Sequence, residues 1–297
     1  MMNIVHKRKK TTAASLKRSL PKLGYDESWI YGTGKLTNEE YHNSPHSIST
    51  SIIKEVANPS ISDYEVYRKY IKRDVEREQK DHFDVGSSAH MAVLEPNVYA
   101  ETVAIRPDEI KVRRGKAWDE FVANNEGKTI ITSEQQNAVM EMRDLINGHS
   151  VARDLLSGTQ AEVSGFRRCN HGVIVRARAD AISHKHKYAV DLKFMDDVSP
   201  AGFSKAAVNN GYYIQDHVYR DVFDLDDFIF ICVSKKDPKE VAIYQLNSEY
   251  QEKAAEKVDE ALGRYKECLE TNRWLSFTDP DESPIVTLTP PTWFAYQ

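Results

Sequence analysis

Three acidic residues and one lysine in the second half of the chain have types and spacing suited to binding a metal ion and acting on a substrate. They are Glu162, Asp180, Asp191 and Lys193. Side chains of a strand alternate between its two faces, so Asp191 and Lys193 share one face of the segment 188–194, and the apolar residues around them share the other. An Asp-x-Lys pair alone is more often a surface ion pair on an exposed strand. The other two acids therefore decide how this pair is interpreted.

The acids can hold a divalent cation if the chain brings them together. Glu162 lies at the start of one predicted strand, and Asp180 lies near the end of the next, where small apolar residues alternate with polar ones. Converging carboxylates repel one another unless a cation lies between them, and hard oxygen ligands favour Mg²⁺ or Mn²⁺. We therefore predict a Mg²⁺ (or Mn²⁺) site at one edge of a sheet.

Hydrophobic periodicity predicts the elements that position these residues. Strands are expected at 163–168, 173–182, 188–194, 228–233 and 241–246, and helices at 200–222 and 248–271. Upstream, helices are expected at 51–56, 63–77, 85–94, 133–147 and 151–156. This order of elements predicts an α/β fold with a mixed central sheet flanked by helices, preceded by a mostly helical N-terminal region.

The same reading predicts the domain organisation. Residues 1–40 are basic and show no sustained periodicity, so we expect a flexible N-terminal arm. Residues 41–297 are expected to form one domain, with a mostly helical part at 41–158 and the α/β core at 159–297.

Composition limits the classes of protein that the chain can belong to. No segment approaches the length of apolar sequence that a membrane helix needs, and the basic N-terminus lacks the apolar run of a signal peptide. The three cysteines are far apart and odd in number, which argues against a disulfide framework, a zinc site or an iron–sulfur cluster. We therefore expect a cytoplasmic protein without a membrane partner. The formal net charge of −5 does not by itself indicate nucleic-acid binding, so basic clusters are judged locally.

Two further motifs flank the acidic residues. Upstream, Gly86-Ser-Ser-Ala-His90 lies in a predicted helix, and downstream Gln215 and Tyr219 are spaced four residues apart on one face of another. With Glu162, Asp180 and Asp191-Leu-Lys193, these motifs resemble the signature of the PD-(D/E)XK (restriction-endonuclease-like) nucleases, in the branch of the RecE-like exonucleases. Trp293 resembles the closing Pro-x-Trp of that branch. The resemblance spans residues 47–297.

The resemblance implies a role for each of these residues. The expected metal ligands are His90, Asp180, Asp191, the backbone carbonyl of Leu192, and Glu162 directly or through water. Lys193 is expected to orient or deprotonate the attacking water, and Gln215 and Tyr219 to hold the nucleotide or that water. The bound metal would polarise the scissile phosphate and acidify a water.

The resemblance also implies a reaction and partners. It implies a Mg²⁺-dependent 5′ to 3′ exonuclease that acts on double-stranded DNA ends and leaves 3′ single-stranded tails for recombination by strand annealing. A homo-oligomeric ring and a single-strand annealing protein are implied in the same way. Expected DNA-binding residues are Arg176, Arg178, Arg113 and Arg114, the last two in the basic segment 111–116.

Several alternatives stay open at this point. The same fold serves endonucleases and structure-specific nucleases, and a catalytically silent DNA-binding module or a metal-independent helical scaffold could keep these residues for other reasons. His90 could be a hydrogen-bonded core histidine, Gln215 and Tyr219 could pack helices, and the arginines could pair with acids across strands. The segment 111–116 could be an ordinary surface loop.

Overall fold

The computed structural model describes residues 36–44, 47–75, 85–169, 171–279, 281 and 285–291. Most of the expected arm and Trp293 lie outside these residues. Among the described residues, no helix combines the length and the apolar character needed to cross a bilayer.

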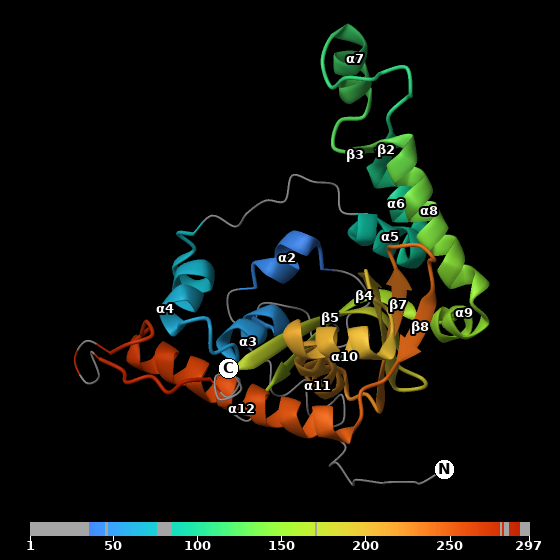
Figure 1. Ribbon diagram of the computed structural model, residues 1–297. Coiled ribbons are helices and arrows are strands. Elements are labelled where there is room, and N and C mark those ends of the chain that lie inside the picture. Colours follow the sequence, from blue (N-terminus) through green and yellow to red (C-terminus); the bar gives the residue numbers. More distant parts are fainter. Residues whose placement is uncertain are drawn as a thin grey trace.

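A six-stranded mixed sheet forms the centre of the molecule (Figure 1). Its strands are β1 (Ser47–Ser49), β4 (Gln160–Arg168), β5 (Ile174–Ser183), β6 (Tyr188–Met195), β7 (Asp227–Ser234) and β8 (Val241–Tyr244). The order is β1-β5-β6-β7-β8, with β4 on the other edge of β5. Pairing is parallel for β1–β5 and β6–β7 and antiparallel for the other pairs. The predicted α/β class and mixed sheet are confirmed.

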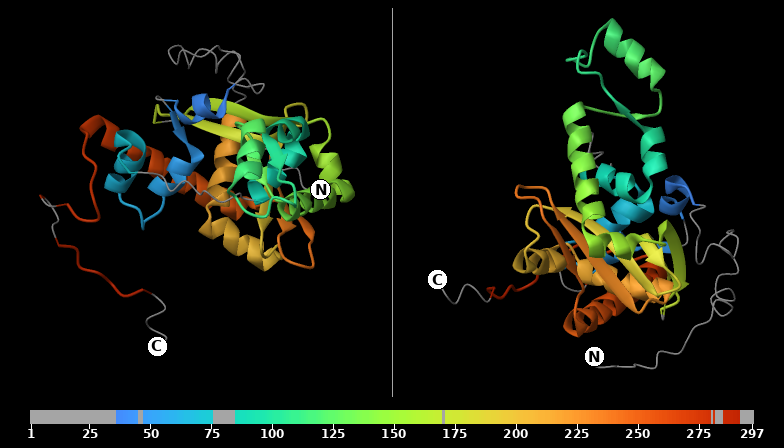
Figure 2. Two further views of the ribbon diagram at one scale, coloured as in Figure 1. Left: turned by 90° about the horizontal axis from the view of Figure 1, so that it is seen from above. Right: turned by 90° about the vertical axis from the view of Figure 1, so that its right-hand side faces the viewer.

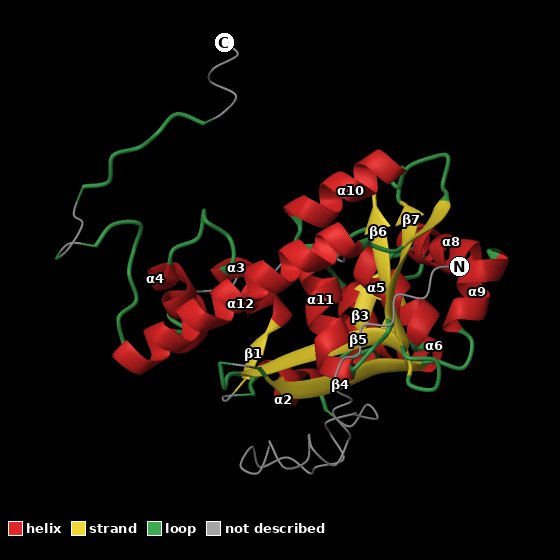
Figure 3. Cartoon of the chain, turned by 90° about the horizontal axis from the view of Figure 1, so that it is seen from below, coloured by secondary structure: helices red, strands yellow, loops and turns green. Residues whose placement is uncertain are grey.

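Helices cover both faces of the sheet (Figures 1 and 3). One face packs against α3 (Thr50–Val56), α10 (Pro200–Asn209), α11 (Tyr212–Phe223) and α12 (Ser248–Thr271). Rings of Phe203, Phe228 and Phe230 lie in the core between them, with neighbouring ring centroids 5.1 to 5.2 Å apart. Burial of such large apolar side chains is the main stabilising contribution to the fold.

The second face of the sheet packs against helices from the first half of the chain. They are α5 (Val85–Leu94), α6 (Pro96–Thr102), α8 (Ser133–Gly148) and α9 (Ser150–Leu156). Val190 and Leu192 of β6 point to this side and are fully buried, as the alternation of the strand predicts. These four helices therefore form the layer on this face of the sheet.

The N-terminal half contains two further parts, and the first is a separate two-stranded sheet. A pair of short parallel strands, β2 (Val103–Ile105) and β3 (Thr129–Ile131), carries α7 (Lys116–Asn124) at the outer end of a projection (Figures 1 and 2). At the other end, α2 (Asn38–His42) begins with a capping box at Thr37. Leu36 beside it is buried against Tyr41, Phe166 and Ile174, so this part of the expected arm packs against the sheet.

Two predicted helices differ from the structure. The helix expected at 200–222 is divided into α10 and α11 because Gly211 has φ +61°, a left-handed conformation that glycine adopts without steric cost. The helix expected at 63–77 is α4 (Asp63–Val66) followed by a π-helix, Tyr67–Lys72. It ends there because Arg73 is left-handed, with φ +56°.

Candidate active site

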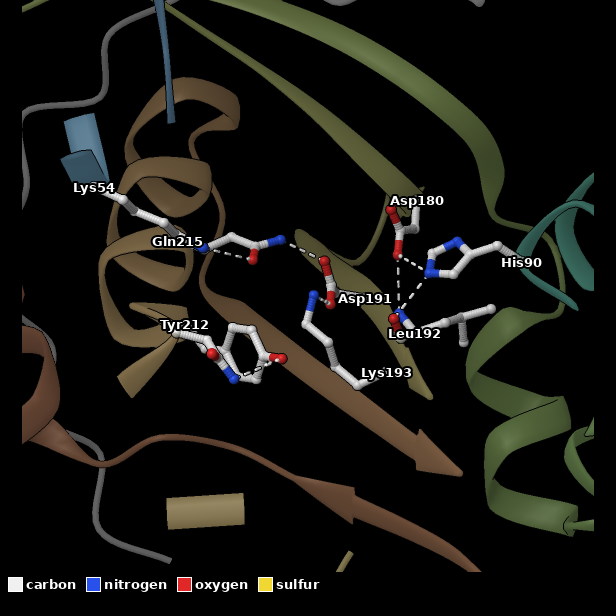
Figure 4. Close-up of polar contacts among 9 residues, drawn as sticks. Lys54, His90, Asp180, Asp191, Leu192, Lys193, Tyr212 and Gln215 are labelled. Carbon is white, nitrogen blue, oxygen red and sulfur yellow. Dashed lines mark hydrogen bonds and ion pairs between the residues drawn. The ribbon is translucent and has the colours of Figure 1, made fainter. Parts of the chain in front are cut away.

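The candidate site lies where strands β5 and β6 separate. Their ladder covers Ala181–Ser183 of β5, and β6 then continues along β7. On the side of β6 that faces β5, the backbone of Leu192 consequently has no strand to pair with and faces side chains. Its N–H donates to a carboxylate oxygen of Asp180 at 2.9 Å, and its carbonyl oxygen lies 2.8 Å from Nε2 of His90 (Figure 4). Separation of two strands thus exposes one peptide unit to a histidine and an acid.

Three ligand atoms converge beside this peptide. His90 from α5, Glu162 from β4 and Asp180 from β5 each offer one atom, and these atoms lie within 4.8 Å of one another. Nε2 of His90 is 3.3 Å from Oδ2 of Asp180. An imidazole nitrogen, two carboxylates and a nearby carbonyl oxygen suit a divalent ion such as Mg²⁺ or Mn²⁺. The structure therefore brings together four of the five expected ligands.

Local backbone geometry produces this convergence. Glu162 lies opposite Asp180 in the β4–β5 register and has φ +52°, which is uncommon for a residue with a side chain. On β5, Ala179 packs on the α3 and α11 side of the sheet, whereas Ala181 packs on the α5 and α8 side. The alternation of side chains is therefore interrupted between Asp180 and Ala181. Such backbone strain persists where the surrounding structure determines it, and it is concentrated at functional sites.

Burial and crowding of the acids raise their pKa values. Burial raises the pKa of Glu162 to about 7, with a further contribution from Asp180. Burial also raises the pKa of Asp180 to about 6. For His90, burial would lower the pKa, but Asp180, Asp191 and the Leu192 carbonyl outweigh it and raise the pKa. A bound cation would favour both carboxylates in their charged form.

Stability of the metal-free protein should fall as the pH rises from about 4.5 to about 7. In that interval an unfolded chain has released the Glu162 proton whereas the folded protein retains it, so deprotonation favours unfolding. Urea denaturation in EDTA at about pH 5 and about pH 8 measures the loss. Glu162→Gln removes this titration and should reduce the dependence to the part that Asp180, whose pKa is also raised, contributes. An unchanged dependence in that variant would mean that Glu162 ionises normally in the folded protein.

Asp191 and Lys193 lie on the other side of Leu192. They share one face of β6, as predicted, but helix α11 covers this face, and the Asp191 side chain is only 3% exposed. One carboxylate oxygen of Asp191 contacts the Lys193 ammonium, and the other accepts a hydrogen bond from the Gln215 amide (Figure 4). The Asp191 carboxylate is therefore outside the cluster of His90, Glu162 and Asp180, and its role as a ligand stays a prediction.

Tyr219, Arg176 and Arg178 make contacts within the protein. Tyr219 is buried, its ring packs edge-on against Phe228, and burial raises the pKa of its hydroxyl well above the usual range. Arg176 is 5% exposed and donates to the Ser47 and His42 carbonyls. Arg178 donates to Ser164 Oγ at 3.0 Å. These contacts hold the segment that leads into α3, and the predicted DNA contacts of both arginines stay predictions.

Arg113 and Arg114 are far from this cluster in the fold. They lie in the exposed loop that precedes α7, at the outer end of the projection (Figure 1). The Arg113 guanidinium lies 5.9 Å from the centre of the Trp118 ring. A DNA contact by these arginines would therefore involve a part of the duplex distant from the acids.

Two residues that we did not predict complete the site. Lys54 of α3 donates to Oε1 of Gln215 at 3.4 Å. The ring of Tyr212 lies beneath two ammonium groups, 4.6 Å from that of Lys193 and 5.5 Å from that of Lys54. Tyr212 precedes Gln215 by three residues and so shares its helical face, a signal present in the sequence. No such signal distinguishes Lys54 from the other lysines.

The fold and this cluster define a PDDEXK-like protein. A family model described as a PDDEXK-like domain of unknown function (DUF3799) matches residues 49–277, and the chain belongs to this family. The predicted PD-(D/E)XK fold is confirmed.

The chain is similar to solved structures at low sequence identity, and the first of the two described next has a similar fold. A protein of Eubacterium rectale named "Putative exonuclease" is 17% identical, with a TM-score of 0.52 over 82% of this chain and 95% of that one. A phage-related exonuclease of Haemophilus somnus 129PT is 15% identical, with a TM-score of 0.35 over 78% of this chain and 98% of that one. No curated protein sequence matches the chain.

Proposed function

We propose that this protein is a Mg²⁺-dependent exonuclease that degrades double-stranded DNA from its 5′ ends and leaves 3′ single-stranded tails. The observation that carries the proposal is the convergence of His90, Glu162, Asp180 and the Leu192 carbonyl beside a buried Asp191–Lys193 pair. Membership of a PDDEXK-like family supports a nuclease, and the name of the Eubacterium rectale protein, whose fold is similar, supports an exonuclease.

Different residues of the site would have different roles in phosphodiester hydrolysis. His90, Glu162, Asp180 and the Leu192 carbonyl would hold the ion, which when bound would neutralise charge on the scissile phosphate and acidify a water. Burial would lower the pKa of Lys193, but Asp191 and Asp180 outweigh it and raise the pKa, so the side chain remains an ammonium. It would therefore donate hydrogen bonds to the attacking water or to a phosphoryl oxygen.

Contacts outside the catalytic cluster belong to the same proposal. Arg113 and Arg114 on the projection would contact the phosphates of the duplex away from the cleaved end, and their exposure leaves them accessible. A homo-oligomeric ring and a single-strand annealing partner complete the proposal, and both rest on the resemblance to RecE-like exonucleases alone.

Digestion of linear and covalently closed circular duplex DNA in Mg²⁺ tests the proposed function. With labels on the 5′ and 3′ ends, we expect loss of the linear DNA from its 5′ ends, an intact circle and no digestion by Asp191→Ala. Cutting of the circle would instead establish an endonuclease. Absence of metal-dependent cleavage of either DNA would point to a DNA-binding module without catalysis.

A further inference from the structure

We propose that Lys54, which lies next to the reaction site of Lys193, binds a DNA phosphate other than the one being cleaved. The inference rests on the proposed function, because it assigns part of the substrate to a second place in the same site. It is carried by the positions and charges of three groups on the α3 and α11 side of β6, which are Lys54, Lys193 and Asp191.

One aromatic ring lies near both ammonium groups. Both lie over Tyr212, whose ring also stacks against Phe203 with centroids 6.1 Å apart. Gln215 connects them further, because it accepts from Lys54 and donates to Asp191. Lys54, Lys193 and Tyr212 are each only half-buried, so the site remains open to a ligand.

Within the described part of the chain, Lys54 is the unpaired cation at this place. Asp191 is paired with Lys193, which also lies near Asp180, whereas among the described residues no carboxylate forms an ion pair with Lys54. Burial lowers the pKa of Lys54 to about 8, and repulsion by Lys193 contributes. An anion between the two ammonium groups would relieve this repulsion. Phosphate oxygens are the anions that a DNA substrate supplies.

The Lys54 side chain is fixed before any ligand arrives. Ser49 caps helix α3, and Ile52 and Ile53 anchor the helix in the core. The aliphatic stem of Lys54 packs over Gly211, where an added Cβ would lie 3.2 Å from its Cγ and Cδ. A side chain already ordered loses less conformational entropy on binding than a mobile surface lysine.

The contact with Gln215 suggests a simpler role in which Lys54 only orients that amide toward Asp191. The two roles predict different measurements. Loss of a phosphate contact weakens DNA binding and lowers its dependence on salt, by a slope of about 0.9 for each phosphate contact. Loss of an orienting contact lowers kcat and leaves DNA affinity and its salt dependence unchanged.

Fluorescence anisotropy with a short labelled duplex in EDTA measures this difference without cleavage. We expect Lys54→Met to weaken binding about tenfold and to reduce the slope of log Kd against log salt by about one, with Lys54→Arg close to wild type. Lys72→Met is the matched control for loss of one charge, because Lys72 is 53% exposed and paired with Asp74. Melting temperatures show whether each variant is folded.

Comparison of duplexes with a 5′-phosphate and with a 5′-hydroxyl identifies the phosphate. An effect of Lys54→Met confined to the phosphorylated duplex assigns the terminal phosphate, and an equal effect on both assigns an internal one. Wild-type affinity and salt slope in folded Lys54→Met would overturn the inference. Failure of the wild type to cleave any DNA would instead overturn the proposed function, so the two failures are distinguishable.

Discussion

Replacing Asp180 with asparagine is expected to lower the rate of metal-dependent DNA cleavage about a thousandfold. Asp180 supplies one of the two carboxylates in the cluster with His90 and Glu162, so its loss removes half of the negative charge that would hold the cation. The side-chain oxygen of asparagine can still accept the hydrogen bond from the Leu192 N–H. The variant should therefore fold and fail specifically in metal binding.

Thermal unfolding with and without Mg²⁺ separates metal binding from folding. An ion at about 100 times its Kd stabilises the folded state by about 2.7 kcal/mol, so the melting temperature of the wild type should rise and that of Asp180→Asn should not. Asp154→Asn is the control, since its side chain is 75% exposed on α9. A normal Mg²⁺ response in Asp180→Asn would remove Asp180 from the metal site.

Periodicity predicted the parts of the site that lie within one element. The alternation along β6 correctly placed Asp191 and Lys193 on one face and Leu192 on the other. The same rule placed Arg176, Arg178 and Asp180 on one face of β5, but it did not predict the irregularity that follows, where Ala181 packs on the α5 side as well. This irregularity, close to the left-handed Glu162, depends on tertiary packing that no pattern of period two contains.

Contacts between segments distant in the sequence explain the other differences between the predicted and the observed site. His90 is 102 residues from Leu192, and Lys54 is 161 residues from Gln215. His90 was identified because it belongs to a motif that resembles a known family, whereas the segment around Lys54 carries no motif that we could name. Gly211 shows a different case, because the glycine was visible in the sequence but its left-handed conformation, with Lys54 packed against it, was not predicted.

Lys193→Met is expected to lower cleavage about a hundredfold to a thousandfold and to destabilise the protein. The loss of activity follows from removing the ammonium that would donate to the water or phosphate. The loss of stability has a separate cause, because Asp191 would remain buried without its cationic partner. Breaking a buried ion pair in this way costs about 3 to 5 kcal/mol of the free energy of unfolding.

The double variant Asp191→Asn, Lys193→Met separates the two effects. It removes the unpaired buried charge, so urea denaturation should show recovery of most of the lost stability, while cleavage stays as low as in Lys193→Met. Recovery of activity together with stability would show that Lys193 acts only by supporting the fold. Because Asp191 is buried, Lys193 is partly exposed and the pair lies beside the cluster of His90, Glu162 and Asp180, a stable but inactive double variant would assign the pair to the reaction.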